Sequence, residues 1–212
     1  MSVGLDVAAL RGERILDIGC DTGVFLKAAQ EECGVVPFGI DVAERAVEVA
    51  RARGIQVWRA AVEDAPPELG EFPVITAIDL LEHVPDPHAF LRAVWSRLRP
   101  GGVLYLETPN ICSAVFRFGR LLSLLTAGRP ASLLERLFPP QHIQLFTPGS
   151  LRALAGRSEF EVLDLRPRIL PSPDIAASAA ARLAIGTLQL FDRLQGTQIL
   201  ICAVLRRPGG KL

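Results

Sequence analysis

The chain has 212 residues, and its 23 basic and 23 acidic side chains give a formal net charge of zero. This length suits one domain with some elaboration, so we expect a single domain over residues 1–212. Because no net positive field and no Lys/Arg block stands out, we expect no nucleic-acid partner. Charged residues interrupt every apolar run well short of the roughly 20 residues that cross a bilayer. We therefore expect a cytoplasmic protein without stable membrane insertion.

The cysteines are far apart and form no closely spaced pair; they are Cys20, Cys33, Cys112 and Cys202. This spacing suggests neither a disulfide framework nor a zinc site. With only three histidines in the chain, a metal site would have to be assembled from distant residues. We expect buried, reduced thiols and no metal.

The first half of the chain alternates short apolar runs with segments of helical period, as in βα units around a parallel sheet. Helices are expected at 24–32 and 43–53, and a third behind Asp86-Pro87, an N-cap followed by proline at the first helical position. The strands expected in this half are 14–18, 36–40, 56–60, 74–78 and 103–108.

The second half begins with a change of period. We interpret residues 111–146 as a helical insertion, in which 112–127 is apolar but carries Arg117 and Arg120. A helix capped by Thr147 follows, then a strand at 160–165 and a proline-broken segment at 166–173. An alanine-rich helix at about 174–194 precedes a last strand at 198–205. The pattern predicts an α/β domain with seven strands.

An acid and a glycine turn follow the first expected strand. The loop contains Asp17, Gly19, Cys20, Asp21 and Gly23, and small side chains there let a ligand approach the backbone closely. A dinucleotide site would require the G-x-G-x-x-G spacing, which this loop lacks. A nicotinamide-dependent oxidoreductase is therefore disfavoured.

Acidic residues also follow the next three strands. Asp41 and Val42 come directly after the second strand, where a carboxylate can bond two ribose hydroxyls, although an acid here is more often an N-cap. Glu63 and Asp64 follow the third strand, either as ligands or as solvated turn acids. The fourth strand leads into Asp79, Leu80 and the continuation Leu81-Glu82-His83-Val84-Pro85.

These segments, with Leu98-Arg99-Pro100-Gly101-Gly102, resemble the class I S-adenosylmethionine-dependent methyltransferases in order and spacing. The resemblance covers residues 14–110 strongly. It continues more weakly through 141–147 to the last strand, where the chain is similar to the small-molecule group that includes the ubiquinone-biosynthesis type. It implies a Rossmann-like three-layer sandwich whose seven-stranded sheet is mostly parallel, with the last strand antiparallel.

The resemblance also implies S-adenosyl-L-methionine as the cofactor and assigns the residues that bind it. The glycine turn would hold the methionine part, Asp41 the ribose, and Glu63 with Asp64 the adenine. A cationic sulfonium and amino group suit the acids beside the turn. The family more often has a second glycine at position 21; if a positive φ is needed there, Asp21 tolerates it at some cost. The cofactor-binding residues expected are Asp17, Gly19, Cys20, Asp21, Gly23, Asp41, Val42, Glu63, Asp64, Asp79 and Leu80.

Methyl transfer from a sulfonium needs alignment of the acceptor with the methyl group, and an oxygen acceptor usually needs a base. His83, at the carboxyl end of a strand, and His142, after a proline pair, are the candidate catalytic bases. Each has a structural alternative, as a pocket residue or as a local backbone contact. Glu107, Asn110 and Arg117 are candidate substrate contacts.

We therefore expect methyl transfer to a small-molecule acceptor, with a hydroxyl oxygen favoured over carbon or nitrogen. The alternative is a non-catalytic methyltransferase-like module that serves a protein partner. The insertion is interpreted as core cover, as a substrate lid or as a membrane contact. The alanine-rich helix can serve packing or a homodimer interface.

Overall fold

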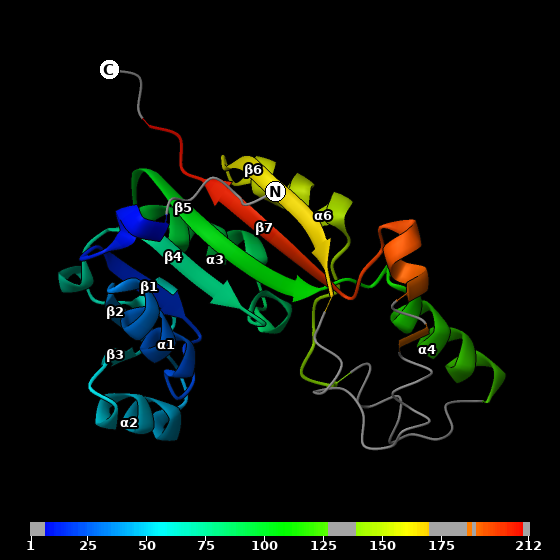
Figure 1. Ribbon diagram of the computed structural model, residues 1–212, viewed down its shortest axis with the longest axis horizontal. Coiled ribbons are helices and arrows are strands. Elements are labelled where there is room, and N and C mark those ends of the chain that lie inside the picture. Colours follow the sequence, from blue (N-terminus) through cyan, green and yellow to red (C-terminus); the bar gives the residue numbers. More distant parts are fainter. Residues whose placement is uncertain (1–6, 127–138, 170–185, 188–189, 210–212) are drawn as a thin grey trace.

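The computed structural model describes residues 7–126, 139–169, 186–187 and 190–209. Its strands form one seven-stranded sheet in the order β3-β2-β1-β4-β5-β7-β6 (Figure 1). The strands are β1 (Arg14–Ile18), β2 (Val36–Asp41), β3 (Gln56–Arg59), β4 (Phe72–Ile78), β5 (Leu98–Pro109), β6 (Glu161–Arg168) and β7 (Leu200–Arg206). The helices are α1 (Val24–Cys33), α2 (Glu44–Ala52), α3 (Pro87–Arg97), α4 (Ala114–Leu125) and α6 (Pro148–Arg157). Short 3₁₀ helices occur at η1 (Val7–Leu10), η2 (Val62–Asp64), η3 (Pro67–Leu69) and η4 (Leu81–His83).

Strands β1 to β5 run parallel to one another, and β7 pairs antiparallel with both β5 and β6. The Rossmann-like sheet with an antiparallel last strand is therefore confirmed. Strand order reverses at β1, which lies between β2 and β4. In open parallel sheets, ligands bind beyond the carboxyl ends of the strands at such a reversal. This places the expected site at the loops after β1, β2 and β4.

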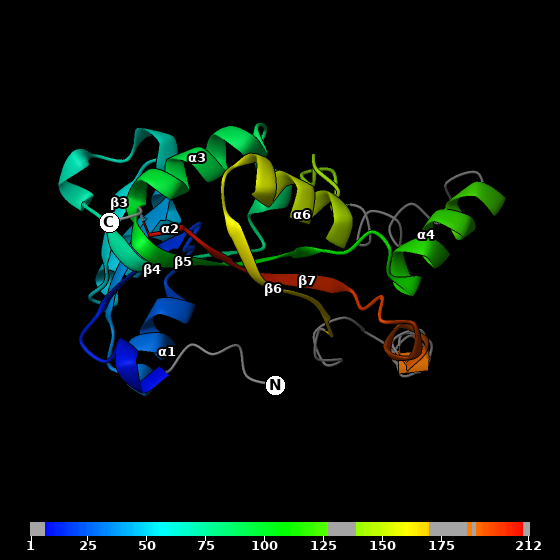
Figure 2. The ribbon, with the colours of Figure 1, turned by 90° about the horizontal axis from the view of Figure 1, so that it is seen from above.

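Helices cover both faces of the sheet. Figure 2 shows α3 and α6 on one side and α1 on the other. The α3 and α6 side holds the larger apolar core, to which Phe90 and Leu91 of α3 and Leu151 of α6 contribute. The core of the opposite face includes Leu26 of α1 and Val47 of α2. Each such buried side chain contributes about 1.5–3 kcal/mol, so the two cores hold the strand ends in place.

Two helix starts follow the sequence prediction. The Asp86 carboxylate accepts hydrogen bonds from the backbone N–H groups of His88 and Ala89 at 3.0 and 2.9 Å. Thr147 caps α6: its hydroxyl accepts from the Ser150 N–H at 3.0 Å, and the Ser150 hydroxyl accepts from the Thr147 N–H at 2.9 Å. Each pair satisfies donors that a helix start leaves free.

The strand limits differ most from the sequence prediction in β6 and β5. We expected the sixth strand to stop at residue 165, yet β6 continues through Pro167 to Arg168. Proline is tolerated there because β6 is the edge of the sheet, where one row of backbone donors has no strand to bond. The fifth strand was expected from residue 103, but β5 begins at Leu98, which pairs with Phe72 across a register shift.

The insertion is described only in part. Helix α4 confirms a helix within 112–127, whereas residues 127–138 lie outside the described residues. Most of the helix expected at 174–194 also lies outside them, although residues 190–195 are helical. Among the described helices, none has the length and hydropathy to cross a membrane.

Candidate active site

The glycine turn after β1 has a left-handed backbone at three positions. Gly19 and Gly23 have φ values of 74° and 75°, and Asp21 has a φ of 45°. A Cβ atom on Gly23 would lie 2.5 Å from the Ile55 side chain, and one on Gly19 would lie 2.9 Å from that of Leu80. Position 21 thus does adopt the conformation that favours glycine, and aspartate tolerates it at some cost.

The Asp41 carboxylate, at the end of β2, ties the glycine turn to the loop before α2. One of its oxygens accepts a hydrogen bond from the Asp21 N–H at 2.8 Å, and the other accepts from the Ala43 N–H at 2.8 Å. A carboxylate offers about four acceptor positions, so each oxygen retains a lone pair. Asp41 is therefore both an anchor of the two loops and an acceptor for further donors.

Asp17 lies beneath the turn and is only 4% exposed. Its carboxyl accepts a hydrogen bond from the Thr76 hydroxyl at 2.6 Å. Burial, assisted by the nearby Asp41, raises the pKa of Asp17 to about 7. Burial and the charge of Asp17 also raise the pKa of the neighbouring Cys20 thiol to about 12, so that thiol stays protonated near neutral pH.

A cavity of about 320 Å³ opens beyond the ends of β1, β2 and β4. This size is within the range of small-molecule sites. Most of its walls are apolar, and Asp41, Glu63 and His83 are the ionisable side chains among its lining residues. The lining is Ile18, Gly19, Ile40, Asp41, Val42, Ala60, Ala61, Val62, Glu63, Leu80, His83, Val84, Pro85 and Phe90.

Several of the cofactor-binding residues expected from the sequence converge on this cavity, and others lie outside it. Those in its lining are Gly19, Asp41, Val42, Glu63 and Leu80. Those outside the lining are Asp17, Cys20, Asp21, Gly23, Asp64 and Asp79. Asp21 does not line the cavity, but its backbone N–H donates a hydrogen bond to the lining residue Asp41. Asp64 is an exposed residue of η2.

Sequence reasoning missed most of the apolar lining. Ala60, Ala61 and Val62 lead directly into Glu63 in the third loop, and Val84 and Pro85 directly follow His83. Their positions beside predicted residues could therefore have indicated their place in the lining. Phe90 belongs to α3, for which the sequence predicted a helix behind Asp86-Pro87 but no place at the site. Its place in the cavity wall depends on where α3 packs, which periodicity does not reveal.

The structure brings the two candidate bases together. The rings of His83 and His142 meet edge to face with centroids 4.8 Å apart. His83 Nδ1 lies 3.0 Å from the Gln141 carbonyl oxygen, and since a carbonyl only accepts, Nδ1 carries the proton there. Nε2 of a neutral His83 is then the acceptor nitrogen. Burial and the neighbouring His83 lower the pKa of His142.

Two carboxyl groups border this histidine pair. Glu82 is 2% exposed, and one of its carboxylate oxygens accepts a hydrogen bond from the Thr108 hydroxyl at 2.9 Å. Burial raises the pKa of Glu82. Burial and the charges of Glu82 and Glu107 raise the pKa of Asp79 to about 6.

Glu82, His83 and His142 also form a possible metal-ligand set. One ligand atom from each lies within 4.8 Å of the other two, and carboxylate and imidazole are donors that Zn²⁺ takes in proteins. We expected no metal because the histidines are far apart in sequence. That reason does not hold in the folded chain, because the segment at 139–146 returns to the end of β4 and brings His142 next to Glu82 and His83.

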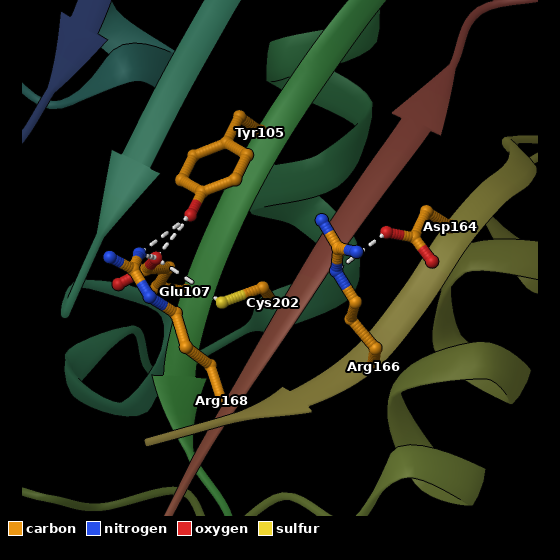
Figure 3. A network of polar contacts seen from close by, with 6 residues as sticks. All are labelled: Tyr105, Glu107, Asp164, Arg166, Arg168 and Cys202. Carbon is orange, nitrogen blue, oxygen red and sulfur yellow. Dashed lines mark hydrogen bonds and ion pairs between the residues drawn. The ribbon is translucent and has the colours of Figure 1, made fainter. Parts of the chain in front are cut away.

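Glu107, a candidate substrate contact, lies within a polar network on β5 (Figure 3). It is 6% exposed and forms an ion pair with Arg168 of β6. Its carboxylate also accepts hydrogen bonds from the Tyr105 hydroxyl and, at 3.2 Å, from the Cys202 thiol. Burial and the charge of Glu107 raise the pKa of Cys202 to about 11. These contacts account for Glu107 without a substrate.

The other two candidate substrate contacts differ in exposure. Asn110 is 1% exposed; its amide nitrogen donates to the Gln198 carbonyl at 2.8 Å, and its amide oxygen accepts from the Cys112 N–H at 3.1 Å. These bonds give Asn110 a structural role at the end of β5. Arg117 is exposed on α4 and lies 3.4 Å from the Gln195 side chain.

Comparison with known proteins decides the family. A family model described as "Methyltransferase domain" matches residues 5–165 of the chain. The chain belongs to this family. The predicted membership of the class I S-adenosylmethionine-dependent methyltransferases is confirmed by this match and by the sheet order.

Curated relatives narrow the resemblance. An enzyme of Xanthomonas campestris named ubiquinone biosynthesis O-methyltransferase is 36% identical over 167 residues, which are 74% of this chain and 66% of the relative. The chain thus spans just under two thirds of that methyltransferase. Another of the same name, from Xanthomonas oryzae, is 35% identical over 175 residues, 78% of this chain and 68% of the relative.

Solved structures of low sequence identity support the methyltransferase fold. A putative methyltransferase from Haloferax volcanii, in complex with an activator protein, has a TM-score of 0.67 at 17% identity and covers 93% of this chain and 84% of its own. At these identities the likeness concerns the fold alone, and a fold can support several reactions.

Proposed function

We propose that this methyltransferase transfers the methyl group of S-adenosyl-L-methionine to a hydroxyl oxygen of a small-molecule acceptor. One observation carries the proposal: the cavity beyond β1, β2 and β4 has the Asp41 carboxylate and the His83 imidazole in the same lining. Asp41 is suited to a cofactor with donor hydroxyls, and His83 is suited to proton removal from an acceptor hydroxyl. The curated relatives named as O-methyltransferases support oxygen as the acceptor atom.

The residues present fit this cofactor. Gly19 lines the cavity without a side chain, and a Cβ atom there would come within 2.9 Å of Leu80 and narrow the space. The apolar walls suit an aromatic base, Asp41 suits ribose hydroxyls, and the acids near the turn suit a cationic ligand. When bound, the cofactor supplies an electrophilic methyl group on a sulfonium.

His83 is the proposed general base. Its Nδ1 proton is directed at the Gln141 carbonyl, so Nε2 keeps a lone pair that can take the acceptor's hydroxyl proton. His142 lies against the His83 ring, and its lowered pKa keeps it uncharged near neutral pH. A neutral neighbour does not oppose the positive charge that His83 gains with the proton.

A second candidate mechanism uses the same groups as metal ligands. The observation that favours it is the convergence of Glu82, His83 and His142 within 4.8 Å. A metal ion there would lower the pKa of a bound acceptor hydroxyl and replace the base. Dialysis against EDTA followed by Zn²⁺ or Mg²⁺ distinguishes the two: turnover that survives EDTA supports the base, and turnover restored only by metal supports the metal.

The first test is calorimetric titration with S-adenosylmethionine and S-adenosylhomocysteine, with NADH as the comparison ligand. We expect micromolar binding of both sulfur ligands and none of NADH. A screen of catechols, phenols and amines for S-adenosylhomocysteine production then tests the acceptor. Methylation of amines alone would contradict the oxygen assignment. Binding without turnover on any acceptor would favour the non-catalytic module.

A further inference from the structure

A second cavity, of about 370 Å³, lies between α3 and the end of α6, two helices that Figure 2 shows on the same side of the sheet. It shares no lining residue with the cavity beyond β1, β2 and β4. Its volume is within the range of small-molecule sites. The lining is His88, Arg92, Trp95, Arg157, Ser158 and Glu159. The active site does not account for this group of side chains.

The sequence of α3 places half of this lining on one face of the helix. Positions 88, 92 and 95 share a face by helical spacing, whereas Phe90, which lines the first cavity, lies on another. Two contacts hold the end of α6 and the start of the next segment against this face. His88 Nε2 lies 3.3 Å from the Arg157 carbonyl oxygen. The Trp95 and Phe160 rings meet edge to face, with centroids 5.1 Å apart. The cavity is therefore built into the packing of α3 and α6.

Positive charge predominates in the lining. Arg92 and Arg157 are exposed, and neither forms an ion pair with an acid in the part of the chain that the structure describes. Glu159 is the acid of the lining. Outside it, the hydrogen bond from the Ala89 N–H and, to a smaller extent, the charge of Arg92 lower the pKa of Asp86. The two arginines thus leave the cavity with an excess of positive charge.

Ser158 adds a hydroxyl group that the fold leaves without a partner. The residue is 4% exposed, and its Oγ atom has no hydrogen-bond partner among the described residues. Its backbone N–H is already bonded to the Leu154 carbonyl at 3.1 Å, so the hydroxyl is not needed to end α6. A buried hydroxyl without a partner costs the fold free energy. Because a hydroxyl can donate and accept, an anion in the cavity offers it the missing partner.

We propose that this cavity binds the phosphate group of a small phosphomonoester whose aromatic or apolar body packs against Trp95. A phosphate has three strong acceptor oxygens, and guanidinium groups match such oxygens with paired N–H donors. The donors assigned to it are the side chains of Arg92, Arg157 and Ser158. The site goes beyond methyl transfer, because it needs neither the cofactor nor the acceptor.

A nucleic acid is a poorer source of the phosphate. Its binding depends on many basic side chains along an extended surface, whereas this lining holds two arginines beside an acid and the whole chain has no net charge. A carboxylate ligand is also a poorer match, since it has one oxygen fewer for the three donors. The cavity therefore favours a small phosphorylated molecule.

Tryptophan emission can report on this cavity separately from the active site. The chain has two tryptophans, Trp58 on β3 and Trp95 on α3, so Trp58→Phe leaves Trp95 as the single reporter. We expect phenyl phosphate to change its emission saturably, with a Kd below about 1 mM, both with and without S-adenosylhomocysteine. Trp95→Phe, which retains Trp58, is the matched control and should show no change with phenyl phosphate. Since the site is read without the cofactor as well, failure of the cofactor assignment leaves this test intact.

Substitutions of the arginines in the Trp58→Phe protein test the assigned donors. Arg92→Gln and Arg157→Gln should each weaken phenyl phosphate binding about tenfold, as for the loss of a charge-assisted hydrogen bond. Arg45→Gln, which removes an exposed arginine of α2, should leave binding unchanged. Benzoate should bind more weakly than phenyl phosphate.

Two further substitutions separate a binding role from a structural one. Ser158→Ala should weaken phenyl phosphate binding about fivefold without lowering stability toward urea, because the hydroxyl has no partner in the fold. Glu159→Gln should tighten binding severalfold, because it removes the negative charge that opposes the phosphate. A structural role alone would change stability and leave both affinities equal to that of the parent protein.

The proposal is overturned by any of four results. These are no saturable change in Trp95 emission at millimolar phenyl phosphate, displacement of phenyl phosphate by S-adenosylhomocysteine, affinity unaffected by Arg92→Gln with Arg157→Gln, and benzoate binding as tight as that of phenyl phosphate. A single-stranded oligonucleotide that bound more tightly than phenyl phosphate, and lost its affinity in the same arginine variants, would reassign the site to nucleic acid.

Discussion

Asp41 is the single side chain on which cofactor binding should depend most. Replacement by alanine removes the proposed bonds to the ribose hydroxyls and the bonds to the N–H groups of Asp21 and Ala43. We expect Asp41→Ala to weaken S-adenosylmethionine binding by about 1–3 kcal/mol, since charge-assisted hydrogen bonds are lost. Calorimetric titration measures this, with the exposed Glu48→Ala as a matched control. Unchanged affinity in the Asp41 variant would refute the assignment.

Asp17 predicts a dependence of stability on pH. Its folded pKa of about 7 lies above the ordinary value of 3.8, so the folded state retains a proton that the unfolded chain releases between these values. The stability contribution is complete below about pH 4 and is lost as the pH rises toward 7. We expect the free energy of unfolding of Asp17→Asn, relative to that of the original chain, to rise by on the order of 1–3 kcal/mol from pH 4 to 8.

Urea unfolding at several pH values measures this trend. Asp21→Asn changes an exposed carboxyl in the same loop and serves as the control substitution. Stability curves of Asp17→Asn and the original chain that stay parallel across this range would show that the carboxyl is not protonated in the fold.

If His83 is the general base, its replacement should lower turnover and leave cofactor binding largely unchanged. His83→Gln should lower kcat about 10²- to 10⁴-fold, the usual contribution of a general base, while S-adenosylmethionine affinity stays within about twofold. His88→Gln is the control, because the His88 ring on α3 lies 3.3 Å from the Arg157 carbonyl and does not line the cavity. A larger loss in His142→Gln would transfer the role of base to His142, and lost cofactor affinity in His83→Gln would make His83 a pocket residue.

At the scale of elements, the capping box of α6 shows how a local sequence sets a helix start. Thr147 and Ser150 exchange hydrogen bonds at 3.0 and 2.9 Å. Thr147→Ala leaves the Ser150 N–H without its acceptor and should lower the free energy of unfolding by about 1 kcal/mol, whereas Thr147→Ser should retain most of the stability. Chemical denaturation of both variants checks this. Equal loss in both would point to the threonine methyl group instead of the hydroxyl.

Strand β6 shows where local reasoning reaches its limit. Proline normally ends a strand because it cannot donate to the ladder, and the sequence prediction ended β6 before Pro167 for that reason. Whether the missing donor matters depends on which side of the strand has a neighbour. That is decided by sheet order, and β6 has β7 on one side only.

At the scale of the whole molecule, cofactor binding should stabilise the fold because the cavity joins loops after several strands. A ligand at about 100 times its Kd adds about 2.7 kcal/mol, which raises Tm by roughly 5–10 °C for a chain of this size. Thermal unfolding with S-adenosylhomocysteine measures the shift, and NADH at the same concentration should give none. A shift with both ligands would mean that the cavity does not select the sulfur ligand.

The sequence by itself determined the element order, most of the strand and helix limits, the glycine turn and the acids at the strand ends. Those features follow from local rules: hydrophobic period, caps and turn chemistry act over a few residues. Asp21 at a positive φ and Asp86 at a helix start were both readable in this way.

Only the tertiary structure decided which of these residues meet. It joined His83 to His142 across 59 positions of sequence, placed Phe90 in the cavity wall and closed Glu107 into a network with Arg168 and Cys202. It also left Leu121, Leu124 and Leu125 of α4 exposed, where the sequence allowed core cover. The physical reason is that contacts between distant segments depend on strand order and helix packing, and no local pattern of residues encodes either one directly.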